Sequence, residues 1–124
     1  MNRTTVISAV ALSAVCAVLS ACAPATRFEW GGYEQALYAY AQNPENRSVY
    51  RTSLEQAIER GERRDAVAPG MYAELGYLDL EDGQGERAIQ NFRRERALFP
   101  ESAVFMDRVI RQLGGTPAES GGQN

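Results

Sequence analysis

Five carboxylates fall within a short stretch of the chain and are the first residues whose chemistry matters; they are Glu74, Asp79, Glu81, Asp82 and Glu86. A pair of carboxylates at a fixed separation can hydrolyse glycosidic bonds. However, Asp79, Glu81 and Asp82 fall at a predicted helix end and turn, where polar side chains are simply solvated, and no apolar surroundings are evident that would raise a carboxyl pKa. The cluster also lacks the alternating acidic spacing of a calcium loop. We therefore predict no enzyme activity and no metal site.

A second chemistry, lipid attachment, is indicated at Cys22. Arg3 precedes an uncharged run at 6–21, which is short for a membrane span but fits the core of a signal peptide. The residues at 19–22, LSAC, resemble the bacterial lipobox, in which signal peptidase II cleaves between Ala21 and Cys22. The resemblance implies a diacylglyceryl thioether on Cys22 and a fatty acyl group, such as palmitate, on its new amino terminus. The alternatives are an ordinary secretory signal or a buried helix that contains a cysteine.

The residues after Cys22 bear on location. Three acyl chains would hold the protein on a membrane essentially permanently. The next residue is Ala23, whereas aspartate there resembles a retention signal for the inner membrane, so the resemblance implies an outer-membrane anchor facing the periplasm. The tether at 22–29 is short, with a reach of roughly 15 Å to Trp30. Phe28 and Trp30 then either touch the lipid headgroups or pack on the first helix.

The remaining composition excludes several function classes. The chain has no histidine, and lipidation of Cys22 would leave the mature chain without a free thiol, which excludes Cys–His nucleophiles, Ser–His–Asp triads and His/Cys zinc sites. A net charge of −3 argues against a nucleic-acid partner. We predict no cofactor and no small-molecule substrate. Arg87 and the arginines at 93–97 mark either an anionic partner or a solvated helix face.

Apolar residues recur at helical spacing through most of the chain, and no stretch alternates as a strand would. The pattern predicts helices at 31–43, within 45–64 with Gly61 as the C-terminal cap, at 70–82, at 86–98 and at 101–113. We therefore predict an all-α, compact antiparallel bundle of about five helices. The expected division of the chain is a signal peptide at 1–21, a lipidated tether at 22–29, a helical domain at 30–113 and a disordered tail at 114–124.

Residues 71–102 resemble one tetratricopeptide repeat, a pair of helices joined by a glycine turn. The matching positions are Tyr72, Leu75, Gly76, Ala88, Phe92 and Pro100. Gly76 and Ala88 are small enough for two helices to approach closely, Phe92 would fill the space towards the next helix, and Pro100 would end the second helix. Two positions depart from the repeat, because Asp79 replaces a tyrosine and Glu95 replaces a small residue.

Residues 30–111 resemble a family of small bacterial tetratricopeptide-like lipoproteins of unassigned function. The resemblance rests on WGGYEQALYAY, APGMYAELGYLDLEDGQGERAIQNF and FPESAVFMDR, and the last is the most specific because generic repeats do not require it. It implies an outer-membrane lipoprotein, found beside a curli-secretion-channel-like lipoprotein and another small lipoprotein. It implies no catalytic residues.

The first helix of a tetratricopeptide repeat lines a groove that holds a partner's segment. By position, Ala73, Tyr77 and Glu81 would face that groove. Tyr77 is equally suited to pack on one of the helices that we expect to cap the bundle, at 31–43 and 101–113. We expect a protein-interaction module that assembles or assists an envelope complex, with a channel-forming lipoprotein as its partner. The alternative is a structural or homeostatic lipoprotein that contacts peptidoglycan or the membrane surface without a dedicated protein partner.

Overall fold

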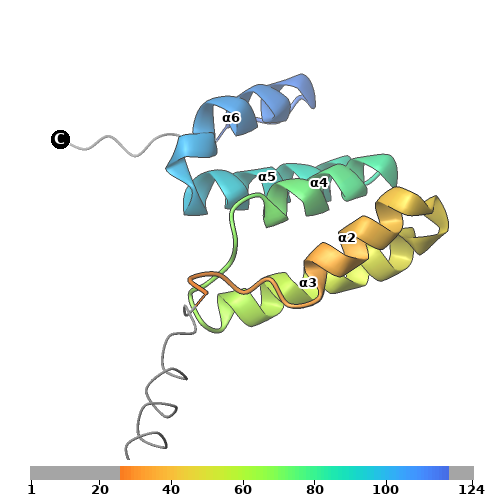
Figure 1. Ribbon diagram of the computed structural model, residues 1–124. Helices are drawn as coiled ribbons and strands as arrows, with labels where there is room; N and C mark the ends of the chain where they lie inside the picture. Colours follow the sequence, from red (N-terminus) through yellow and green to blue (C-terminus); the bar gives the residue numbers. More distant parts are fainter. Residues whose placement is uncertain (1–25, 118–124) are drawn as a thin grey trace, which may run out of the picture.

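The computed structural model describes residues 26–117, which form a bundle of helices (Figure 1). The α-helices in this range are α2 (Tyr33–Gln42), α3 (Arg47–Glu62), α4 (Met71–Glu81), α5 (Gly85–Leu98) and α6 (Ala103–Gln112). Short 3-10 turns, η2 (Pro44–Asn46) and η3 (Pro100–Ser102), precede α3 and α6. The described residues contain no strand, which confirms the all-α prediction. The predicted signal peptide, Ala21 and Cys22 lie outside the described residues.

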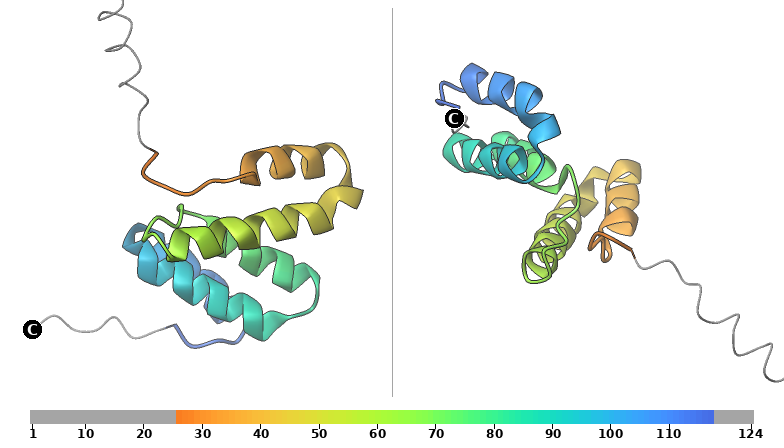
Figure 2. Two further views of the ribbon diagram at one scale, coloured as in Figure 1. Left: turned by 90° about the horizontal axis from the view of Figure 1, so that it is seen from below. Right: turned by 90° about the vertical axis from the view of Figure 1, so that its left-hand side faces the viewer.

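The helices stack in layers (Figure 2). Helices α2 and α3 form one antiparallel pair and α4 and α5 form another, while α6 lies on the side of α4–α5 that faces away from α2–α3 (Figure 1). Two hydrophobic cores fill the space between these layers. The first lies among α2, α3 and α4, and the second is built by α5 and α6 with Ala73 and Leu80 of α4 packed against it. Helix α4 therefore contributes to both cores.

The connections follow from turn chemistry. Between α2 and α3, the Asn43 side chain accepts a hydrogen bond from the backbone N–H of Glu45 at 3.0 Å, and Pro44 begins the 3-10 turn. Gly61 does not cap α3 as predicted, because the helix continues to Glu62. Gly61 is instead needed for close approach, since a Cβ there would lie 2.8 Å from the Cα of Val67.

A ladder of five aromatic rings fixes the N-terminal segment to the first core. Phe28 meets Trp30 edge-on at 6.4 Å between ring centroids, and Trp30 lies 5.9 Å from Tyr33. Tyr33 in turn lies 6.1 Å from Tyr50, which stacks on Tyr40 at 5.1 Å. Of the two expectations for Phe28 and Trp30, packing on the first helix is therefore observed.

Hydrogen bonds and ion pairs reinforce this attachment. The backbone N–H of Glu29 donates to the carbonyl of Ala66 at 2.7 Å, which forms an isolated parallel bridge between Glu29 and Val67. The Glu29 carboxylate pairs with Arg60 at 3.4 Å and with Arg64 at 2.9 Å. The segment that leads towards Cys22 thus leaves the bundle beside the end of α3.

Candidate interaction surface on helix α4

The three predicted partner-binding residues occupy different environments on α4. Tyr77 is 41% exposed, and its ring meets the buried ring of Phe92 edge-on, with centroids 5.2 Å apart. Glu81 is exposed near the end of the helix and pairs with Arg47 of α3 at 3.2 Å. Ala73 is half-buried against the second core. Tyr77 and Glu81 thus offer exposed surface, whereas Ala73 is largely covered.

The contact between α4 and α5 depends on Gly76. A Cβ at this position would lie 2.7 Å from Cε1 of Phe92, closer than real side chains come. Phe92 and Ala88 are both fully buried, and Phe92 belongs to the second core with residues of α6. The ring that supports Tyr77 is therefore held in place by the close approach of the two helices.

The carboxylate of Glu74 accepts hydrogen bonds from two tyrosine hydroxyls. The hydroxyl of Tyr33 donates to Oε1 at 2.6 Å, and the hydroxyl of Tyr50 donates to Oε2. Burial, together with the hydrogen bond to Glu74, raises the pKa of Tyr33 and of Tyr50. Glu74 therefore acts as a shared acceptor that joins α2, α3 and α4.

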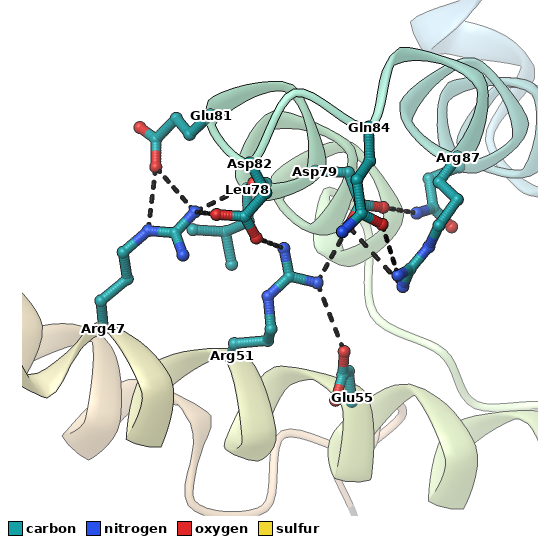
Figure 3. Close-up of polar contacts among 10 residues, drawn as sticks. Arg47, Arg51, Glu55, Leu78, Asp79, Glu81, Asp82, Gln84 and Arg87 are labelled. Atoms are coloured by element: carbon teal, nitrogen blue, oxygen red, sulfur yellow. Dashed lines mark hydrogen bonds and ion pairs between the residues drawn. The ribbon is translucent and has the colours of Figure 1, made fainter.

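Asp79 is not solvated, contrary to the sequence-based prediction, because its side chain is completely buried (Figure 3). Its Oδ1 accepts from Arg51 of α3 at 2.9 Å and lies 3.7 Å from Arg87, while its Oδ2 accepts from Asn91 of α5 at 2.8 Å. A buried carboxylate needs partners of this kind. The residue that departs from the repeat pattern thus links three helices.

Arg51 and Arg47 extend this cluster to the end of α4 (Figure 3). Arg51 also pairs with Asp82 at 2.8 Å and with Glu55 at 3.4 Å. Arg47 pairs with Asp82 at 3.0 Å and donates to the carbonyl of Leu78 at 2.9 Å, one of the last carbonyls of the helix. Sequence reasoning missed Arg47, Arg51 and Asn91. Arg47 and Arg51 lie 31 and 28 positions from Leu78 and Asp79, and Asn91 lies 12 positions from Asp79, so no local pattern connects these partners.

Glu95 of α5, the second residue that departs from the repeat pattern, is 3% exposed. Its side chain reaches the start of α4. Its Oε1 accepts from the backbone N–H of Gly70 at 2.7 Å. Burial raises the pKa of Glu95, and the hydrogen bond from Gly70 opposes that shift. The side chain therefore caps the N-terminus of α4 from the neighbouring helix.

The remaining repeat positions and the arginines also have intramolecular partners. The buried Tyr72 donates to Glu62, accepts from Arg94 at 3.1 Å and has the Arg94 guanidinium 5.4 Å from its ring centre. Arg93 donates to the carbonyl of Thr116 at 2.7 Å. Leu75 is buried in the first core, and Pro100 begins the turn after α5. The arginines of α5 thus contact other parts of the fold.

No group of histidine, cysteine, aspartate or glutamate between residues 26 and 117 is arranged to hold a metal ion. Within the same residues, no helix has both the length and the apolar character needed to cross a bilayer.

Comparison with known proteins identifies one family. A model of a domain of unknown function, DUF4810, matches residues 28–109, which is more than half of the chain. The match begins at Phe28 in the aromatic ladder and ends within α6. Searches of curated proteins and of solved structures found no match.

Proposed function

The chain belongs to the DUF4810 family, and we propose that it is an outer-membrane lipoprotein whose helical domain is a tetratricopeptide-like protein-interaction module. In this proposal Cys22 carries the lipid, Ala23 permits transfer to the outer membrane, and the domain faces the periplasm. The domain assembles or assists an envelope complex, with a channel-forming lipoprotein as its partner. The proposed lipid attachment rests on the lipobox-like residues at 19–22.

One observation carries the interaction role, namely the position of Tyr77. The Tyr77 side chain is 41% exposed, and its edge-on contact with the buried ring of Phe92 restricts its motion on one side. Binding a partner to such a side chain costs little conformational entropy, and tyrosine is enriched among residues that dominate binding energy. Glu81 lies one helical turn further along α4 and provides an adjacent charge.

The proposal includes no catalytic step. Glu74 is bound by two tyrosine hydroxyls, and Asp79 is bound by Arg51 and Asn91. A catalytic carboxylate must instead reach a substrate atom within hydrogen-bond distance. These contacts support a structural role for the two most enclosed members of the acidic cluster.

The test is photo-crosslinking in the native host, with a photoreactive residue in place of Tyr77 in the full-length protein. The matched control places the same residue at Tyr38 on α2, which is 69% exposed. A Cys22→Ser variant then tests whether lipid attachment is required. We expect one dominant envelope protein to be captured from position 77, not from position 38, and to be lost with Cys22→Ser.

Products that are scattered over abundant envelope proteins, or that are identical from positions 77 and 38, would contradict the interaction module. The alternative, a structural or homeostatic lipoprotein without a dedicated protein partner, predicts that result. It also predicts direct binding of the delipidated domain to isolated peptidoglycan or to lipid, which the interaction module does not require.

A further inference from the structure

The junction between α5 and α6 exposes three large apolar side chains within residues 98–105. Leu98 is 48% exposed at the end of α5, and Val104 and Phe105, in the first turn of α6, are 75% and 51% exposed. The only charged residue between positions 98 and 105 is Glu101. Clustered exposed apolar residues usually mark a contact surface. This stretch includes most of the FPESAVFMDR motif, which the helix pair α4–α5 does not explain.

The junction lies at the end of the bundle from which the chain leads back towards Cys22 (Figures 1 and 2). A pocket of about 600 Å³ connects the two features. Its lining includes Arg27 and Phe28 of the N-terminal segment and Leu98 and Phe99 of the junction. The N-terminal segment therefore emerges directly beside the junction.

The length of the chain before this segment limits how far the junction can lie from the anchor. Only five residue steps separate Cys22 from Arg27, and a fully extended chain covers at most about 17 Å over that distance. An acylated Cys22 would lie at the surface of the bilayer. The opposite end of the bundle lies further away, because the 16 residues of α3 add about 24 Å.

We propose that the junction at 98–105 docks on the lipid bilayer, with Leu98, Val104 and Phe105 inserted between the phospholipid headgroups. Apolar side chains gain free energy when they leave water for this interfacial region, and a covalent anchor nearby keeps their local concentration high. Docking would place the end of the bundle next to the tether against the bilayer, so that the start of α3 lies far from the membrane. The inference rests on the proposed lipid attachment of Cys22.

The test uses hydrogen–deuterium exchange of the mature protein in vesicles of phosphatidylethanolamine and phosphatidylglycerol. Two matched variants are compared, Val104→Asp and Val49→Asp. Val49 is 57% exposed in the first turn of α3, at the end of the bundle remote from the tether. Both changes put an aspartate at an exposed position near a helix start, so neither should prevent folding.

We expect amides at 98–105 to exchange more slowly on vesicles than in solution, and amides around Val49 to be unaffected. Val104→Asp should weaken docking about tenfold or more and abolish the protection, since it replaces an inserted valine by a charge, whereas Val49→Asp should leave the protection intact. Equal exchange on and off vesicles, or equal effects of the two variants, would overturn the proposal. Protection that needs an added envelope protein would also overturn it.

The mass of the N-terminal peptide reports lipidation separately. A protein without lipid on Cys22 would contradict the proposed anchoring but would leave the docking surface open to the same test. In that case the mature chain, which has only one cysteine after removal of Cys16 with the signal peptide, is coupled to the vesicles through a thiol-reactive lipid.

Discussion

The guanidinium of Arg51 on α3 lies 2.9 Å from the carboxylate of Asp79 on α4, and the Asp79 side chain is completely buried. Asn91 of α5 binds the other oxygen of the same carboxylate. Because these partners come from three helices, the ion pair fixes how the α4–α5 pair sits on α3. In the resemblance of residues 71–102 to a tetratricopeptide repeat, Asp79 stands at a tyrosine position.

Asp79→Ala should lower the free energy of unfolding by about 3 kcal/mol, because it leaves Arg51 and Asn91 without their buried partner. The matched control is Glu55→Ala, which removes a partially exposed partner of the same guanidinium and should cost less than about 1 kcal/mol. Urea denaturation followed by circular dichroism measures both values. Equal effects would show that burial of Asp79 is unimportant.

Gly76→Ala should destabilise the fold by about 1–3 kcal/mol, because its Cβ would collide with the ring of Phe92 and overpacking outweighs the better helix propensity of alanine. Gly85→Ala is the control, since a Cβ there meets nothing within 4 Å, and it should be neutral or stabilising. Thermal denaturation of both variants tests the prediction. If Gly76→Ala raises the melting temperature as Gly85→Ala does, the helices are not as close as described.

The hydrogen bonds from Tyr33 and Tyr50 to Glu74 predict that the protein loses stability at alkaline pH. The pKa values of Tyr33 and Tyr50 are raised by burial and by Glu74, so the stability they confer is complete below pH about 10 and is lost as the pH rises towards their folded-state values. Glu74→Gln should lower both values, because it removes the negative charge that disfavours tyrosinate. Tyrosinate absorbance during alkaline titration measures the change. Tyr38→Phe, which removes an exposed tyrosine, should leave this loss of stability in place.

Glu95 predicts a pH dependence of the opposite kind from an ordinary ion-paired carboxylate. Its pKa is raised mainly by burial, so the unfolded chain ionises it first, at pH about 4.3. The stability gained from its neutral form is complete below that pH and is lost as the pH rises through the folded-state pKa. Relative to the wild type, Glu95→Gln should therefore become more stable as the pH rises from about 4 to 7. Urea denaturation across this range tests the prediction, and Glu86→Gln, an exposed change on the same helix, should keep the wild-type slope.

The helices and most of their bounds could be predicted from the sequence alone. Apolar spacing and breakers such as Pro44 and Pro100 are local signals, and the predicted bounds agree with the structure to within a few residues. The close contact at Gly76 was also predictable, because a glycine and a bulky aromatic at repeat spacing imply that two helices approach. The lipobox-like cleavage and lipidation site that we predict at 19–22 lies outside the described residues.

The polar contacts could be decided only by the tertiary structure. Asp79 and Glu95 looked like solvated residues or departures from a repeat, but packing of α3 and α5 against α4 buried both of them. Arg51 is 28 positions from Asp79, and no spacing in a single sequence reveals such a pair. The physical reason is that the cost of burying a charge depends on which partners surround it, and only the packed fold brings those partners together.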